Sequence, residues 1–250
     1  MPKRSRKQSS DVGYGDSGQV IIDAVTRVLA VNGPGAVMVG DICKELGVSP
    51  SLVNYHFGSR ERLLAEAVVR EHEKLVADMN AITYSTLSSP EEQMRARIMH
   101  RVAWTTQHPG IDSMVNYSHL IDPVGEVLQG ELAERVSQCT IADMAGLHTS
   151  IYGMYVGQAL SAPPAELGYE DVFELVDITA YLALGCLGLA TWMTGHHPAS
   201  RTLGFEHPDT MLYLADSYVA RLIRNVRTEV EQVRADRSTD GKVTMSRQPR

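Results

Sequence analysis

Apolar residues recur at every third or fourth position through most of this chain, and Gly and Pro fall mainly between those stretches. This is the period of an α-helix with one buried face, and signals for strands are scarce. The sequence therefore predicts an all-α protein. The expected helices cover residues 18–31, 39–46, 50–57, 59–79, 90–107, 114–120, 124–160 with a break, 170–194 and 208–235.

The short helices near the N-terminus have clear end signals. Gly47 is placed to end the second helix, because glycine accepts the left-handed backbone of a helix C-terminus. Ser49 is a good N-cap for the third helix, and Pro50 takes its favoured first position. Val53 and Phe57, four residues apart, give the third helix an inward face. Two short helices joined by Gly-Val-Ser have the spacing of a helix-turn-helix.

The segment over residues 18–64 resembles the TetR family of bacterial repressors. The resemblance rests on the leading helix, the Gly47-Val48-Ser49 turn, Tyr55-His56-Phe57, and Ser59-Arg60-Glu61 followed by Leu63-Leu64. It implies an N-terminal three-helix DNA-binding domain followed by a larger helical domain for ligand binding and dimerisation. The expected division is a flexible basic tail at 1–17, the DNA-binding domain at 18–64, the larger domain at 65–236 and a disordered tail at 237–250.

In that family the third helix contacts the bases, and the resemblance implies the same role here. Two positions depart from the family pattern. Met38 stands where a Thr or Ser often holds a phosphate, and Asn54 stands where a second aromatic is usual. Asparagine can form paired hydrogen bonds to adenine, so Asn54 is the best candidate for direct base recognition. The predicted DNA-contacting residues are Ser49, Pro50, Ser51, Leu52, Asn54, Tyr55, His56 and Arg60.

The net charge of −7 argues at first sight against a nucleic-acid partner. Its distribution matters more, because the acidic excess lies beyond the first eighty residues. The first ten residues carry Lys3, Arg4, Arg6 and Lys7 and no acid. This basic tail either contacts phosphates or the minor groove, or is only a solvated tail.

Several other classes of protein lack their sequence signals here. The three cysteines, Cys43, Cys139 and Cys186, are far apart and odd in number, so a reducing cytoplasm is expected. The start has no apolar secretory region, and the apolar stretch at 181–193 is too short to span a bilayer. No metal or cofactor is expected. Phosphate-loop, HExxH and Gly-x-Ser-x-Gly motifs are absent, so no enzyme is expected, although a helical enzyme or a protein-binding adaptor stays open as an alternative.

The resemblance also implies a pocket for a small organic effector inside the larger domain. Mostly apolar walls with a few polar groups suit such a ligand, although the same residues also suit an ordinary core. The last two long helices carry small and apolar residues, which fit a homodimer interface. The prediction is a dimeric repressor that binds a palindromic operator and is released by its ligand. The predicted ligand-binding residues are His100, Trp104, Met114, Tyr117, Met144, His148, Tyr152, Tyr155 and Tyr181.

Overall fold

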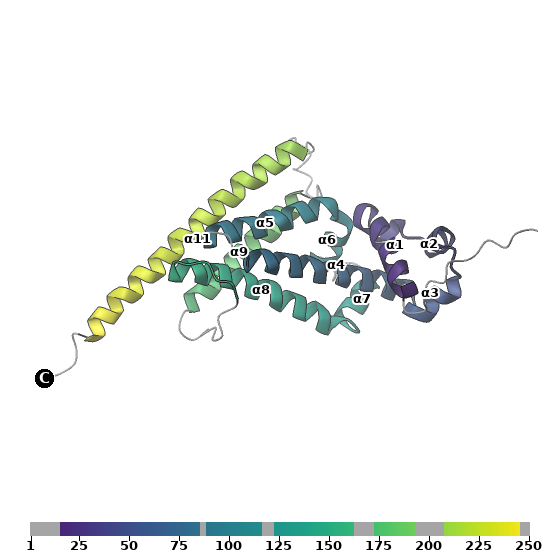
Figure 1. Cartoon of the computed structure of the whole chain (residues 1–250), viewed down its shortest axis with the longest axis horizontal. Coiled ribbons are helices and arrows are strands. Elements are labelled where there is room, and N and C mark those ends of the chain that lie inside the picture. The colour runs from purple at the N-terminus through teal and green to yellow at the C-terminus, as the bar shows by residue number, and fades with distance from the viewer. Residues whose placement is uncertain (1–15, 86–88, 117–122, 163–172, 194–207, 246–250) are drawn as a thin grey trace, which may run out of the picture.

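The computed structural model describes residues 16–85, 89–116, 123–162, 173–193 and 208–245, and every regular element within these ranges is a helix. Figure 1 shows an elongated molecule with the first three helices at one end. Helix α4 runs from them into a bundle, and the last helix crosses the other end of that bundle. The elements are α1 (Asp16–Asn32), the short 3-10 helix η1 (Pro34–Ala36), α2 (Val39–Leu46), α3 (Pro50–Phe57), α4 (Arg60–Thr83), α5 (Pro90–Gln107), α6 (Pro109–Asn116), α7 (Val124–Gln129), α8 (Ala133–Val156), α9 (Phe173–Met193) and α11 (Pro208–Met245).

Local signals in the sequence set many of these helix ends. Gly47 has a φ of 67° and lies in the left-handed region at the end of α2. Ser49, Ser59 and Ser89 cap α3, α4 and α5, because each hydroxyl oxygen accepts a hydrogen bond from the backbone N–H three residues later. The all-α prediction is confirmed, and α2, α3 and α5 have the expected bounds.

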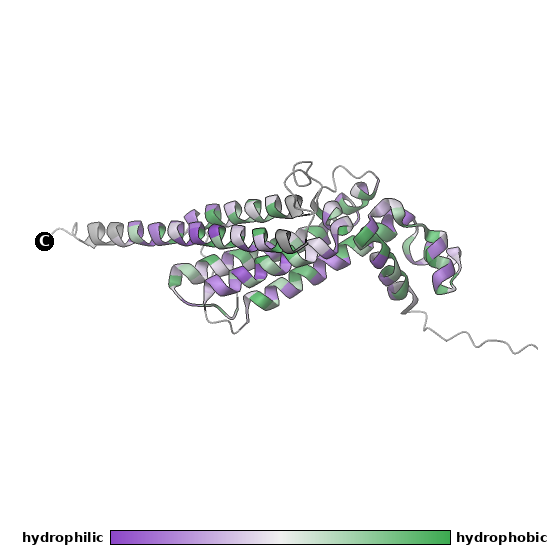
Figure 2. Ribbon diagram, turned by 90° about the horizontal axis from the view of Figure 1, so that it is seen from above, coloured by the Kyte–Doolittle hydropathy of each residue, from purple (hydrophilic) through white to green (hydrophobic). Residues whose placement is uncertain are grey.

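Two expectations about helix ends were wrong. The sequence predicts no helix between residues 107 and 114, but Pro109 begins α6, since the first turn of a helix tolerates a residue without an N–H. The tail expected to be disordered from residue 237 is helical as far as Met245. Contacts with the bundle extend this helix: Arg234 donates to the Met154 carbonyl at 2.5 Å, and Arg237 pairs with Glu174 at 2.9 Å. Figure 2 shows that hydrophilic residues predominate where α11 projects from the bundle.

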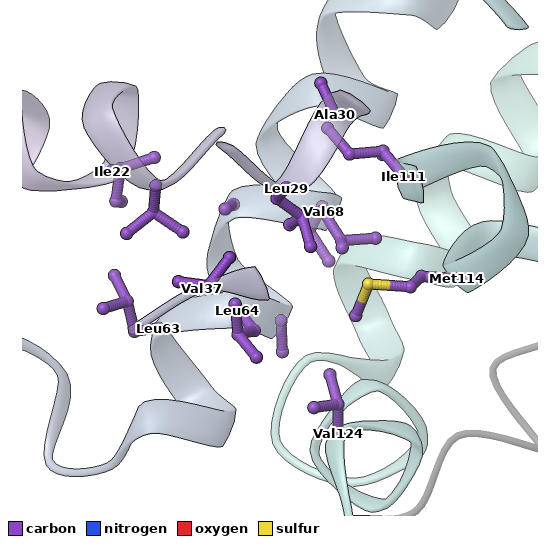
Figure 3. Packing of buried hydrophobic residues seen from close by; sticks show 14 of the residues in the cluster. Ile22, Leu29, Ala30, Val37, Leu63, Leu64, Val68, Ile111, Met114 and Val124 are labelled. Carbon is purple, nitrogen blue, oxygen red and sulfur yellow. The ribbon is translucent and has the colours of Figure 1, made fainter. Parts of the chain in front are cut away.

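Two hydrophobic clusters fill the interior. The first cluster joins the N-terminal helices to α4, α6 and α7, and Figure 3 shows Leu29, Val37, Leu64, Ile111 and Met114 meeting within it. The second cluster packs α5, α8, α9 and α11 along their lengths. The first cluster therefore continues across residue 64, where the sequence suggested a domain boundary.

At Gly110 the backbone of α6 lies against the end of α1. A Cβ placed there would collide with the Leu29 carbonyl oxygen and lie 2.7 Å from the Gly33 nitrogen. Only a residue without a side chain allows this approach of two backbones. The contact links a helix far along the sequence to the first helix of the chain.

Candidate nucleic-acid interface

Helices α2 and α3 form a helix-turn-helix at the free end of the molecule. The Val48 N–H donates to the Cys43 carbonyl at 3.0 Å, which closes the turn after Gly47. Ile42 of α2 and Val53 of α3 are buried in the first cluster, together with Phe57. The buried side of α3 is thus held against α1 and α2, and its opposite side is presented outward.

The outward side of α3 carries hydrogen-bonding groups. Ser51, Asn54 and Tyr55 are exposed, and Tyr55 keeps 71% of its surface accessible. Pro50 is exposed at the first turn, and Leu52 is half-buried. A helix of this width fits the major groove, where amide and hydroxyl groups can discriminate between base edges.

The described part of this N-terminal unit supplies little positive charge. Residues 16–64 contain four basic and five acidic side chains. Arg27 pairs with Glu45 at 2.6 Å, and Lys44 lies 3.2 Å from Asp41. The basic residues at 3–7 are outside the described residues, but their sequence carries the charge that the helix-turn-helix lacks.

Comparison with known proteins agrees with this geometry. The family described as "Bacterial regulatory proteins, tetR family" matches residues 21–67, which cover the helix-turn-helix and its supporting helices. The HTH-type transcriptional regulator BetI of Rhizobium meliloti (strain 1021) is 26% identical over 165 residues, which are 60% of this chain and 81% of that protein. BetI of Brucella anthropi is 27% identical over 158 residues, which are 57% of this chain and 81% of the relative.

A solved structure has the same fold. It is a transcriptional regulator of the TetR/AcrR family from Thermobifida fusca YX-ER1, with a TM-score of 0.57 and 16% sequence identity, and the match covers 83% of this chain and 97% of that one. The N-terminal unit of this chain therefore belongs to the TetR family. It is a DNA-binding transcriptional regulator, and proteins of this family are normally not enzymes.

Three of the predicted DNA-contacting residues of this regulator also have roles within the chain. Ser49 caps α3, and its hydroxyl oxygen lies 3.2 Å from the Leu52 nitrogen. His56 is half-buried, and its Nε2 lies 2.8 Å from the hydroxyl of Ser17, which ties α3 to the start of α1. Arg60 donates to the carbonyls of Pro34 and Val37 at 2.5 and 3.2 Å. Contacts of His56 and Arg60 with DNA stay predictions, and both side chains would make them in addition to, or in place of, these intramolecular bonds.

The predicted ligand-binding residues do not gather at one place. Trp104 and Met114 are buried in the first cluster, and the indole of Trp104 stacks on His108 with a centroid distance of 4.8 Å. Met144, Tyr152 and Tyr155 pack against the second cluster. His148 is also buried and lies 3.2 Å from the Thr179 hydroxyl, as a satisfied core histidine does.

Two more of these residues lie outside both clusters. Tyr181 is 52% exposed on α9, so it does not line the interior of a single chain, and its contact with a ligand stays a prediction. His100 is half-buried beside α4, with its Nε2 atom 3.9 Å from Asp78. Tyr117 lies outside the described residues.

Between the two clusters lies a group of buried and half-buried charged and polar side chains that the sequence did not reveal. We call Asn80, Thr83, Arg97, Arg101, Asp112 and Asp143 the polar layer. On α8, Asp143 lies four residues after Cys139 of the first cluster and four before Leu147 of the second. The available signal was the pair Arg97 and Arg101, which recurs at helical spacing among the apolar residues of α5.

Arg97 is the best-supported member of the polar layer and is only 1% exposed. One Nη donates to Asn80 at 2.8 Å and to Thr83 at 2.9 Å. The other donates to the Asp143 backbone carbonyl at 2.9 Å and pairs with the Asp143 carboxylate. Burial lowers the pKa of this guanidinium and Asp143 opposes that shift, so the buried charge depends on its partners.

The neighbours of the polar layer are held in uncharged forms. Burial, aided by the charge of Arg101, lowers the pKa of His72 on α4 to about 4. Burial raises the pKa of the Cys186 thiol on α9 to about 12. Around neutral pH both groups therefore add no charge to the layer.

Partly exposed ion pairs connect α4 to the α7–α8 region. Arg135 binds Glu66 at 2.6 Å and Glu73 at 2.8 Å, and the hydrogen bond from Arg135 lowers the pKa of Glu73. Arg62, one turn after the helix-turn-helix, pairs with Glu131 at 2.8 Å.

No helix within the described ranges is long and apolar enough to cross a membrane.

Proposed function

We propose that this regulator is a cytoplasmic repressor that binds a palindromic operator as a homodimer and leaves it when a small organic effector binds. The observation that carries the DNA-binding part is the outward face of α3. Asn54 and Tyr55 are exposed there, while Val53 and Phe57 hold the opposite face in the core. We propose Asn54 as the direct base contact, because its amide can both donate to and accept from adenine.

An exposed apolar face on α9 and α11 supports the dimer. Tyr181 and Leu184 are exposed on α9, and Leu212, Tyr213 and Tyr218 are exposed on α11. Large apolar side chains gathered on two neighbouring helices are unusual on a monomer. A second copy meeting the same face would bury them in a four-helix interface with two-fold symmetry, which matches a palindromic operator.

Release by an effector requires that the dimer has two geometries. One must bind DNA more tightly, and the other must bind the ligand more tightly. The first cluster supports this proposal, because α6 lies on the end of α1 through Gly110. A shift of α6 would therefore move the helix against which α3 is packed. We propose α4, which joins the helix-turn-helix to the bundle, as the second connection.

Gel-shift titration against the regulator's own promoter region tests the DNA-binding part. We expect saturable binding to one fragment, with Asn54→Ala weakening it by about 5- to 150-fold, which corresponds to about 1–3 kcal/mol. Gln129→Ala, an exposed change at the end of α7, serves as the matched control and leaves affinity unchanged. Sequence-blind binding by the wild type would contradict the proposal.

Deleting residues 1–10 tests the basic tail separately. If its four cations neutralise phosphates, the deletion weakens binding to all sequences and makes affinity less dependent on salt.

Light scattering tests the dimer. The double change Leu184→Glu and Tyr213→Glu places charge on the apolar face and should give monomers. A wild-type protein that stays monomeric at micromolar concentration would rule out the dimer.

A further inference from the structure

The two arginines of the polar layer differ in how well they are satisfied. Both Nη atoms of Arg97 have partners at hydrogen-bonding distance, as described above. Arg101, one turn later on α5, has its nearest carboxylates at 3.7 Å: Asp112 from one Nη atom and Asp143 from the other. Its Nε atom is buried, and no group in the described ranges accepts a hydrogen bond from it.

A buried guanidinium N–H without an acceptor is costly and uncommon, so this one calls for a specific explanation. We propose that the Nε–H of Arg101 is the recognition point for the effector and donates to the carbonyl oxygen of an uncharged small molecule such as a ketone, lactone or ester. This inference rests on the proposed function and specifies the chemical class of its ligand.

Charge balance favours an uncharged ligand over an acid. The polar layer contains two guanidinium groups and two carboxylates, so its formal charges cancel. His72 and Cys186 beside it stay neutral around pH 7 because burial shifts the pKa of each away from neutrality. A carboxylate ligand would add an unbalanced charge next to Asp112 and Asp143, whereas a carbonyl oxygen satisfies the donor without adding charge.

The position also suits access and signalling. Arg101 keeps 16% and Asp143 keeps 23% of its side-chain surface exposed, so the polar layer reaches solvent at this edge. Asp112 lies on α6, where it accepts a hydrogen bond from Thr105 at 3.1 Å. Two residues earlier on the same helix, Gly110 is packed on the end of α1. A ligand that moves Asp112 relative to Arg101 therefore acts on the helix that touches the DNA-binding unit.

The test uses 2-octanone as the probe, with octanoate and octylammonium as length-matched charged probes. Calorimetry and the carbonyl ¹³C resonance of labelled 2-octanone are measured on the full chain. We expect 2-octanone to bind at least about tenfold more tightly than either charged probe, and its resonance to shift on binding. Arg101→Met should reduce affinity by about tenfold and abolish the shift, as expected for loss of one hydrogen bond from a charged donor.

Two further variants keep the test decisive. Arg101→Lys retains the charge but lacks the Nε–H, so it should also lose the resonance shift, even if Arg101→Met folds poorly. Arg95→Met lies on the same helix outside the polar layer, where Arg95 pairs with Asp216, and should bind like the wild type. Equal binding of 2-octanone by wild type and Arg101→Lys, octanoate binding as tightly as 2-octanone, or no binding of 2-octanone overturns the inference.

Operator binding is measured on the same samples without any probe. If the operator is bound but 2-octanone is not, this inference fails and the proposed DNA-binding function stands. If 2-octanone binds through Arg101 while no operator is recognised, the proposed function fails and the ligand site stands.

Discussion

The two hydrophobic clusters are built from differently arranged helices. The second cluster packs four long helices side by side, with residues such as Ile151, Leu182 and Val219 fully buried along their lengths. The first cluster gathers the ends and short segments of helices that are far apart in sequence, including α1, α6 and α7. Side-by-side packing spreads a small displacement over many contacts, whereas a junction of helix ends concentrates it at a few. The difference indicates where this regulator can change its geometry.

The polar layer separates these two regions. Because buried charges tolerate few arrangements, the bonds of Arg97 to Asn80, Thr83 and Asp143 restrict how the helices of the two clusters sit against each other. The following variants test this comparison, from the largest expected effect to the smallest.

Asp143→Ala should have the largest effect. It leaves Arg97 buried without its carboxylate and removes one of the two acids near Arg101, so we expect a loss of about 3–5 kcal/mol in the free energy of unfolding. Urea denaturation measures this loss. Asp216→Ala, which breaks the exposed pair with Arg95, is the control and should cost below about 1 kcal/mol. Equal losses would show that the polar layer has no special role.

His72 should make stability depend on pH. Its pKa in the fold is about 4, against 6.5 when unfolded, so between these values the unfolded chain binds more protons and is favoured. The free energy of unfolding should therefore be unaffected by His72 above pH 6.5 and fall by about 3 kcal/mol as the pH drops to 4. Denaturation of His72→Gln over the same range should lack this part of the slope, and an unchanged slope would contradict the assignment.

Gly110→Ala tests the junction in the first cluster. The added methyl group collides with the backbone at the end of α1, so we expect a loss of about 2 kcal/mol and a displaced DNA-binding unit. Thermal denaturation and operator affinity should change together. Gly40→Ala has open space around its Cβ and should keep stability within about 1 kcal/mol of the wild type. A Gly110→Ala protein as stable as Gly40→Ala would mean that α6 does not bear on α1.

Arg62→Ala should have the smallest effect. The Arg62–Glu131 pair is about half exposed on both sides, so its removal should cost below about 1 kcal/mol, and the cost should vanish in high salt. Measurement at low and high salt separates this pair from the buried layer. A large loss of unfolding free energy that does not depend on salt would contradict this prediction. It would mean that the Arg62–Glu131 pair contributes to the connection between α4 and α7 as much as the first cluster does.

The parts of the fold that follow local rules could be predicted from sequence. The bounds of α2 and α3 depend on Gly47, Ser49 and Pro50, which act on their immediate neighbours. The start of α6 was missed because Pro109 has opposite meanings inside a helix and in its first turn. The extension of α11 was missed because Arg237 is held by Glu174, which is distant in sequence.

The site was predictable to a different degree. The helix-turn-helix follows from an ordered set of neighbouring residues, and its outward side chains could be named. The polar layer could not be recognised in the same way, because Arg97 and Arg101 look like solvated helix residues until α8 brings Asp143 beside them. His56 and Arg60 likewise found partners at Ser17 and Pro34 that their spacing does not indicate.

The continuity of the first cluster has a consequence for engineering hybrid regulators. A chimera that exchanges DNA-binding units at residue 64 would take Val37 from one parent protein and Ile111 from the other. The first cluster of the chimera would then combine two halves that do not match. A transplanted unit would have to bring α6 and α7 with it, or be redesigned where α1 meets Gly110. Operator specificity in this scaffold is therefore better altered by single replacements on α3 than by swapping domains.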